Sequence, residues 1–165
     1  MSEVIAPGPA ANAGRYLTFT LGRETYGIPV LQVREIIRMT DITPVPRMPA
    51  HVKGVINLRG KVTPVMDLGL RLDLAEAAIT DRTCIIVAQL PQSGRVPALL
   101  GLIVDAVEEV VPIAAAALEA PPTFGGSVQT DFILAMVRVK GGVRTLLDLE
   151  KLVAAGVGGA LQPAA

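Results

Sequence analysis

Two apolar runs meet within Lys53-Gly-Val-Ile-Asn-Leu-Arg-Gly-Lys-Val-Thr-Pro-Val-Met-Asp-Leu68, on either side of Asn57-Leu-Arg-Gly60. Short runs rich in Val and Ile that flank a turn residue predict a pair of β-strands, and glycine lets the backbone reverse between them. A purely structural turn favours Asn-Gly or Asp-Gly at its tip, so Leu-Arg-Gly needs another explanation. Arg59 is therefore the first candidate for a functional role.

Upstream of this hairpin the chain predicts more extended structure. Residues Tyr16–Leu21 alternate apolar and polar side chains, Gly22-Arg23 supplies a turn, and Thr25–Ile28 resumes the extended pattern, which together predict another hairpin. After Pro29 we expect one helical turn followed by a strand.

An internal repeat organises the rest of the chain. Two segments recur in the same order, and in that register Gly60 meets Gly141 while Arg59 meets Lys140. A unit of about five short strands has a size that closes into a small barrel. We therefore expect each copy to form a barrel, with the halves meeting near residues 70–85 and a groove between them. The matching segments are Val33-Arg-Glu-Ile-Ile37 with Val107-Glu-Glu-Val-Val111, and Val62–Leu68 with Val143–Leu149.

The chain ends differ in composition from its centre. Residues 1–14 and 156–165 are rich in Ala, Gly and Pro and lack periodic patterning, which predicts flexible tails around a folded body at 15–155. No apolar run approaches the roughly 20 residues of a membrane-spanning helix, and no signal peptide is visible. We expect a soluble cytoplasmic protein without direct membrane insertion.

Composition narrows the classes of partner. The 165 residues are 51% hydrophobic but only 3% aromatic, and 15 basic residues balance 15 acidic ones. A small nucleic-acid-binding barrel is the alternative from another class, but it needs a basic face with interleaved aromatic rings, which this composition disfavours. We expect no nucleic-acid partner.

An enzyme needs a nucleophile, a base or a metal cluster, and these groups are scarce. His51 is the single histidine and Cys84 the single cysteine, and neither has a catalytic motif or metal-ligand spacing around it. Asp67 and Asp148 precede helical starts and are expected to be caps. The sequence therefore predicts no catalytic residue, metal site or cofactor.

Glu35 and Arg59 stand out among the remaining charged residues. An arginine at a hairpin tip presents a planar fork that fits a carboxylate, so a Glu35–Arg59 pair would form the wall of a recognition surface. The alternative is a solvated strand residue and an ordinary surface charge.

Five motifs in order resemble CheW, the coupling protein of bacterial chemotaxis arrays, over about Tyr16 to Val153. The resemblance implies an all-β fold of two pseudo-symmetric five-stranded SH3-like barrels with short helical turns and a C-terminal helix. The motifs are Phe19-Thr-Leu-Gly22 with Tyr26-Gly-Ile28, Val33-x-Glu-Ile36, Lys53-Gly-Val-x-Asn-Leu-Arg-Gly60, Val62-x-Pro-Val-x-Asp-Leu68 and Gly101-Leu-Ile-Val-Asp105.

The same resemblance implies a function. It is that of a non-enzymatic adaptor that links methyl-accepting chemoreceptor tips to the regulatory domain of the histidine kinase CheA, recruited to membrane-associated receptor arrays. A related chemosensory pathway of pili, motility or development is the alternative. The resemblance places the family's conserved arginine on Arg59 and its acidic partner on Glu35. It places receptor-coupling positions on Val33, Gly54, Val107 and Val110.

Overall fold

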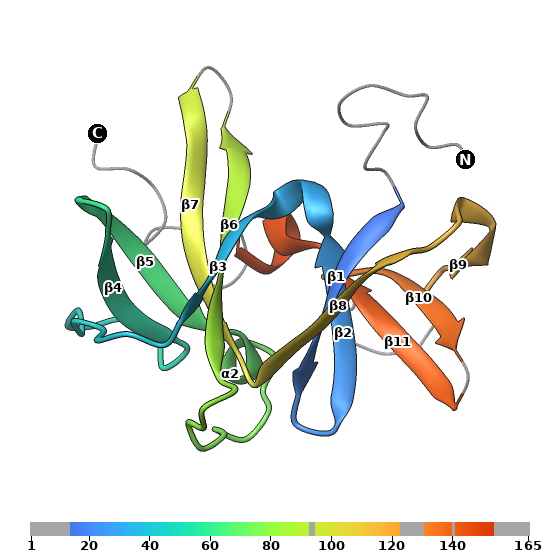
Figure 1. The fold of residues 1–165 in the computed structure, drawn as a ribbon, viewed down its shortest axis with the longest axis horizontal. Helices are drawn as coiled ribbons and strands as arrows, with labels where there is room; N and C mark the ends of the chain where they lie inside the picture. The colour runs from blue at the N-terminus through green and yellow to red at the C-terminus, as the bar shows by residue number, and fades with distance from the viewer. Residues whose placement is uncertain (1–13, 93–94, 123–130, 140, 154–165) are drawn as a thin grey trace.

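The chain builds two β-sheets that lie side by side and share one apolar core (Figure 1). The structure, a computed structural model, describes residues 14–92, 95–122, 131–139 and 141–153. Nearly all of both predicted tails, and Lys140, lie outside the described residues.

The first sheet, called barrel I below, has the strand order β3-β6-β7-β5-β4. The segment that follows β3 returns to β4, where Thr43 and Val55 exchange two backbone hydrogen bonds of 2.9 Å. This contact brings the two edge strands of barrel I together. The strands are β3 (Val33–Arg38), β4 (Val52–Leu58), β5 (Lys61–Asp67), β6 (Cys84–Gln92) and β7 (Arg95–Val104).

The second sheet, barrel II, has the order β8-β1-β2-β11-β10-β9. Strand β9 follows β8 along the chain and pairs with β10, so it repeats the contact that Thr43 makes in barrel I. The strands are β1 (Arg15–Leu21), β2 (Glu24–Pro29), β8 (Ala106–Pro112), β9 (Leu118–Glu119), β10 (Ile133–Val139) and β11 (Gly142–Leu147).

Helical structure is short, as predicted. The 3-10 turn η2 (Val30–Gln32) precedes β3, which confirms the expected helical turn and strand, and the 3-10 turn η3 (Ala115–Ala117) precedes β9. The helix α2 (Leu68–Arg71) follows β5, and residues 149–153 are helical after β11.

The barrels are related strand by strand. The parallel pair β5–β7 brings Val65 beside Gly101, and the equivalent pair β11–β2 brings Leu146 beside Gly27. A shift in pairing register at Val52/Gly54 recurs at Ile133/Ala135. The all-β prediction of two pseudo-symmetric barrels is confirmed.

The expectation that each copy of the repeat closes its own barrel is wrong, because the copies exchange hairpins. The β1–β2 hairpin of the first copy pairs with β8 and β11, and the β6–β7 hairpin of the second pairs with β3 and β5. Because each hairpin is inserted into the barrel of the other copy, both of its faces are buried. In β6, Ile85 and Val87 face the core of barrel I while Ile86 and Ala88 face the shared core, which explains an apolar run without alternation.

The shared core joins the two barrels through side chains of both. It contains Leu17, Phe19 and Ile28 of barrel II and Met66, Ile86 and Leu102 of barrel I, all at most 3% exposed. Burying a side chain of this size stabilises the fold by about 1.5–3 kcal/mol. The two barrels are therefore expected to unfold together.

Candidate functional site

Arg59 lies in a two-residue turn between β4 and β5. The φ angles of Arg59 and Gly60 are 50° and 84°, and the Asn57 Oδ1 atom accepts a hydrogen bond of 2.7 Å from the Gly60 amide. A left-handed backbone is unfavourable for a residue with a Cβ atom. Asn57 thus stabilises the turn, a role that sequence reasoning missed, and Arg59 occupies a position where another glycine or asparagine would be easier to accommodate.

The side chain of Arg59 binds Glu35 with both ends of its guanidinium group. Nη1 donates to Oε2 at 2.6 Å, and Nη2 donates to Oε1. Glu35 lies on β3 and Arg59 directly after β4. These are the two edge strands of barrel I, so the ion pair spans the place where the edge strands meet, which is called the seam below. The predicted pair is confirmed.

Electrostatics keep this pair ionised. The hydrogen bonds from Arg59, with the nearby charges of Arg59 and Arg34, lower the pKa of Glu35, while the hydrogen bond and charge of Glu35 raise the pKa of Arg59. A carboxyl group whose pKa is lowered in the folded state loses its contribution only when the pH falls through that lowered value. The pair therefore persists throughout the neutral range.

The ion pair borders a surface cavity of about 400 Å³ on barrel I, whose lining also includes Arg34, Lys61, Gln89 and Leu99. Three cationic side chains and one carboxylate line the cavity, and Leu99 adds apolar surface. Such a site favours a partner that presents an acidic group beside an apolar one.

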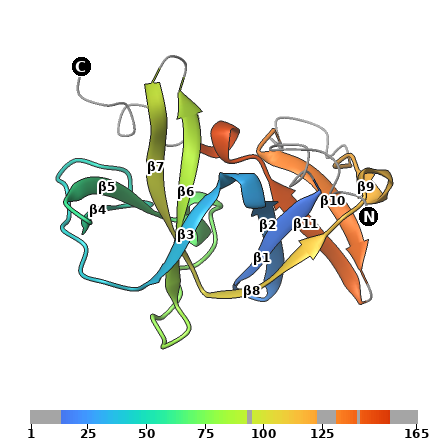
Figure 2. The same cartoon turned by 45° about the horizontal axis from the view of Figure 1, so that its top comes forward.

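The three predicted valines lie on the equivalent edge strands β3 and β8, which Figure 2 shows in the middle of the molecule. Val33 and Val107 are half-buried against the shared core, while Val110 is 49% exposed. Side chains of the shared core fill the space behind Val33 and Val107. Val110 is thus the valine of this set that offers free apolar surface.

Gly54 is buried, and its backbone explains the residue type. Its φ angle is 141°, and a Cβ atom there would lie 2.0 Å from the carbonyl oxygen of Thr43. Thr43 pairs with Val55 beside this glycine, so a side chain at position 54 would displace the segment that joins the two edge strands of barrel I.

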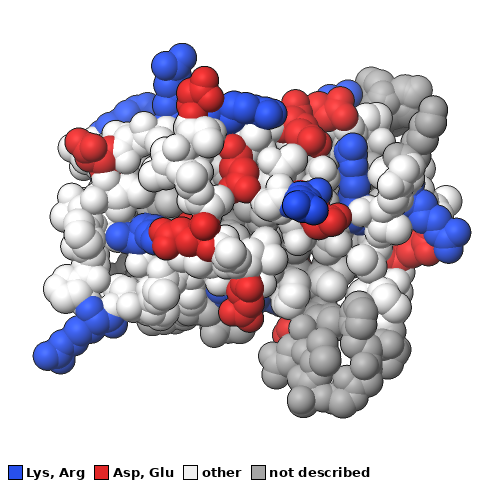
Figure 3. Space-filling view, turned by 90° about the horizontal axis from the view of Figure 1, so that it is seen from below, with Lys and Arg blue, Asp and Glu red and all other residues white. Residues whose placement is uncertain are grey.

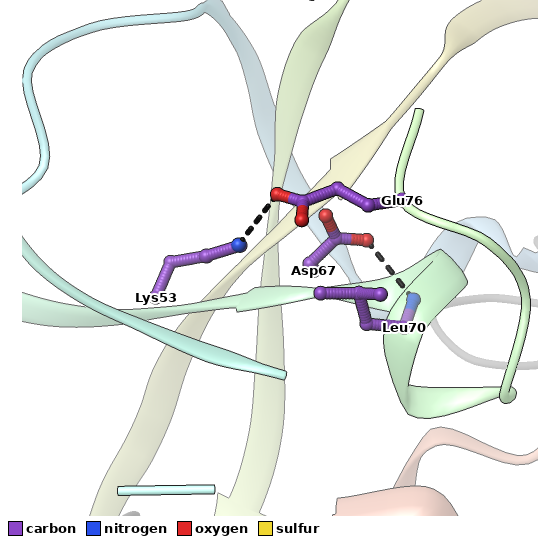
Figure 4. A network of polar contacts seen from close by, with 4 residues as sticks. All are labelled: Lys53, Asp67, Leu70 and Glu76. Atoms are coloured by element: carbon purple, nitrogen blue, oxygen red, sulfur yellow. Dashed lines mark hydrogen bonds and ion pairs between the residues drawn. The ribbon is translucent and has the colours of Figure 1, made fainter. Parts of the chain in front are cut away.

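A second polar cluster lies where β5 meets the segment between the copies. Lys53 Nζ lies 2.8 Å from Glu76 Oε2, and Asp67 Oδ1 accepts a hydrogen bond of 3.1 Å from the Leu70 amide (Figure 4). Asp148 accepts likewise from the Lys151 amide at 3.2 Å. Both aspartates are therefore helix caps, as predicted.

The remaining candidates are the single cysteine and the single histidine. Burial raises the pKa of the half-buried Cys84 thiol, and the backbone carbonyl of His51 accepts a 2.7 Å hydrogen bond from the Asp67 amide. The described residues include no group of His, Cys, Asp or Glu arranged to hold a metal ion.

The described helices are too short or too polar to cross a membrane. On the face seen in Figure 3, basic and acidic side chains lie next to one another with uncharged surface between them.

Comparison with known proteins agrees with these features. The model of the CheW-like domain matches residues 15–156. The chemotaxis protein CheW of Rhizobium meliloti (strain 1021) is 34% identical over 142 residues, covering 86% of this chain and 88% of that protein. Protein FrzA of Myxococcus xanthus is 33% identical over 139 residues, covering 83% of each. The crystal structure of the scaffolding protein TtCheW from Thermoanaerobacter tengcongensis superposes with a TM-score of 0.76 at 31% identity, covering 91% of this chain and 97% of that one.

Proposed function

This chain belongs to the CheW-like family of scaffold proteins, which are not enzymes, and we propose that it couples methyl-accepting chemoreceptors to the histidine kinase CheA. It would act in the cytoplasm, where receptor tips and the kinase meet at membrane-associated arrays. The observation that carries the proposal is the forked Arg59–Glu35 pair beside a cationic cavity. An exposed pair of this kind contributes little to stability, so its presence at a turn where Arg59 has a left-handed backbone favours a role in docking.

The receptor-binding surface would combine this pair with the neighbouring edge strands. Glu35 and Arg59 supply charge and orientation, and Val110 supplies exposed apolar contact. Val33 and Val107 would support the surface from the shared core, and Gly54 would hold the seam that the ion pair spans. A receptor helix that presents an acidic and an apolar side chain would fit such a surface.

The direct test is co-sedimentation of receptor cytoplasmic fragments and CheA with and without this chain. We expect CheA to sediment with the receptor fragments only when the chain is present. Sedimentation of CheA at its background level in the presence of the chain would contradict the proposal.

A pair of matched variants tests the apolar part of the surface. Val110→Glu should abolish receptor binding and spare CheA binding, because it places a charge at the exposed apolar contact. Val143→Glu, at a valine 50% exposed on β11, is the control and should leave receptor binding intact. Equal loss of receptor and CheA binding in Val110→Glu would contradict the assignment.

The same surface would serve a coupling protein of a related chemosensory pathway for pili, motility or development. The two alternatives differ in the receptor set and kinase rather than in the docking chemistry. Co-purification of the tagged chain from its own cells, with the bound receptors and kinase identified, separates them.

A further inference from the structure

Asp105 lies at the place where the chain passes from barrel I to barrel II. Strand β7 of barrel I ends at Val104 and strand β8 of barrel II begins at Ala106, so Asp105 is the single residue of this crossover. A bend of one residue between two sheets has no regular backbone pairing of its own. Its geometry depends on the contacts that Asp105 makes.

Two hydrogen bonds tie Asp105 to the β1–β2 hairpin. Its amide donates to the Thr20 carbonyl at 3.1 Å, and its Oδ2 atom accepts from the Gly22 amide at 2.8 Å. Gly22 is exposed at the tip of that hairpin. The carboxylate therefore satisfies a turn amide and fixes the crossover to barrel II at the same time.

The other crossover, from β2 to β3, is built differently. Gly27 and Gly101 occupy equivalent places in the two parallel strand pairs. Leu31 lies four residues after Gly27 and Asp105 four residues after Gly101, so Leu31 and Asp105 are equivalent positions. Pro29 and the 3-10 turn η2 shape the backbone there, and the Leu31 carbonyl accepts a hydrogen bond from Gln89 Nε2 at 3.3 Å. The duplicated scaffold thus does not require an aspartate at a crossover.

Side-chain packing does not fill the space between the barrels beside Asp105. A cavity of about 230 Å³ lies there, lined by Leu21, Arg23 and Tyr26 from the β1–β2 hairpin and by Asp67, Leu74 and Ala77 from the other side. The shared core holds the barrels together, but apolar burial is non-directional. Hydrogen bonds are directional and can set the angle between the barrels.

From this geometry we propose that Asp105 is a positioning residue that pins the hinge between the barrels. The inference rests on the proposed function, because the proposed receptor surface combines Glu35 and Arg59 of barrel I with Val110 of barrel II and so depends on the angle between the barrels. Asp105 touches neither partner in this account. It acts through the β1–β2 hairpin.

The hinge is tested by the distance between spin labels on Val62→Cys and Val143→Cys in a Cys84→Ala background. These two valines are 71% and 50% exposed and lie on equivalent strands, one in each barrel. Asp105→Leu, which installs the residue of the other crossover, should broaden the distance distribution. Asp105→Asn keeps an acceptor oxygen and should leave it narrow. Equal widths for the parent, Asp105→Leu and Asp105→Asn would overturn the proposal.

Hydrogen exchange in the unmodified chain gives a second measurement that needs no variant. The Gly22 amide is on an exposed turn, yet it should exchange slowly because the Asp105 carboxylate accepts its hydrogen bond. Exchange at the rate of an unstructured amide would overturn the proposal even if Asp105→Leu failed to fold.

The functional consequence is measured with CheA and a receptor fragment. Asp105→Leu should weaken binding of the receptor fragment alone about tenfold, because the parts of the receptor surface on the two barrels no longer keep a fixed angle, while Asp105→Asn should bind as the parent does. Receptor binding by Asp105→Leu as tight as the parent's would overturn the role of Asp105. If the parent bound neither partner, the proposed function would fail, and the label distances would still decide the hinge.

Discussion

Barrel I and barrel II place equivalent strands in the same order, yet they differ in residue type at positions that the strand order does not constrain. Both have a parallel pair at the centre, the same shift in register and a segment that joins the edge strands. They differ at the seam, where barrel I has Gly54 and barrel II has Ala135, and at the crossovers, where Leu31 is matched by Asp105. The comparison teaches that duplication supplied the scaffold, in which Val33 and Glu35 are matched by Val107 and Glu109, while Gly54 and Asp105 lie at positions where the copies diverged.

The largest effect should come from separating the two copies. The halves 1–78 and 79–165 should each remain unfolded alone, because each barrel takes a hairpin from the other copy. Mixed, they should regain the strand signal in circular dichroism and dispersed amide resonances. Native-like resonances from either half alone would contradict the exchange of hairpins.

The next largest effect tests the difference at the seam. Gly54→Ala should destabilise the chain by at least about 3 kcal/mol, because the new Cβ meets the Thr43 carbonyl and the left-handed backbone is strained. Ala135→Gly, at the equivalent position of barrel II, should cost only about 1 kcal/mol. Urea denaturation measures both, and equal costs would show that the seams do not differ.

A third comparison uses the two glycines of the parallel pairs. A Cβ at Gly101 would lie 2.9 Å from Ile85 Cγ2, whereas one at Gly27 would lie 2.8 Å from Leu146 Cδ2. Leucine can turn its terminal methyl away more easily than a β-branched isoleucine can. Gly101→Ala should therefore cost about 1–3 kcal/mol and Gly27→Ala less, as thermal unfolding would reveal. The reverse order would contradict this packing argument.

The smallest effect concerns the two caps, where the copies agree. Asp67→Ala and Asp148→Ala should each cost about 1 kcal/mol, because each removes one acceptor for a helix amide. Asn at either position should restore most of the loss in a denaturant titration. A cost at Asp67 far above that at Asp148 would assign Asp67 a further role beside Lys53 and Glu76.

Sequence reasoning reached the strands, the repeat and the Glu35–Arg59 pair because these depend on local pattern and on charge type. It did not predict that each hairpin pairs with strands of the other copy, because hydrophobic period and strand propensity describe single strands and not their pairing partners. The exchange is visible afterwards in the unbroken apolar run of β6, whose two faces are both covered. The roles of Asn57 and Asp105 depend on backbone amides brought near by the fold, for which the sequence carries no direct signal.

The central claim is that Arg59 and Glu35 form a docking surface, and exchanging their charges tests it most directly. Arg59→Glu alone should weaken formation of the receptor–CheA complex about tenfold, with little change in melting temperature, and adding Glu35→Arg should recover much of the loss. The matched control is the Arg138–Glu119 pair of barrel II, whose Nε and Oε2 atoms lie 2.9 Å apart and whose exchange should leave the affinity unchanged. An affinity unaffected by Arg59→Glu, or lowered equally by the Arg138–Glu119 exchange, would contradict the account.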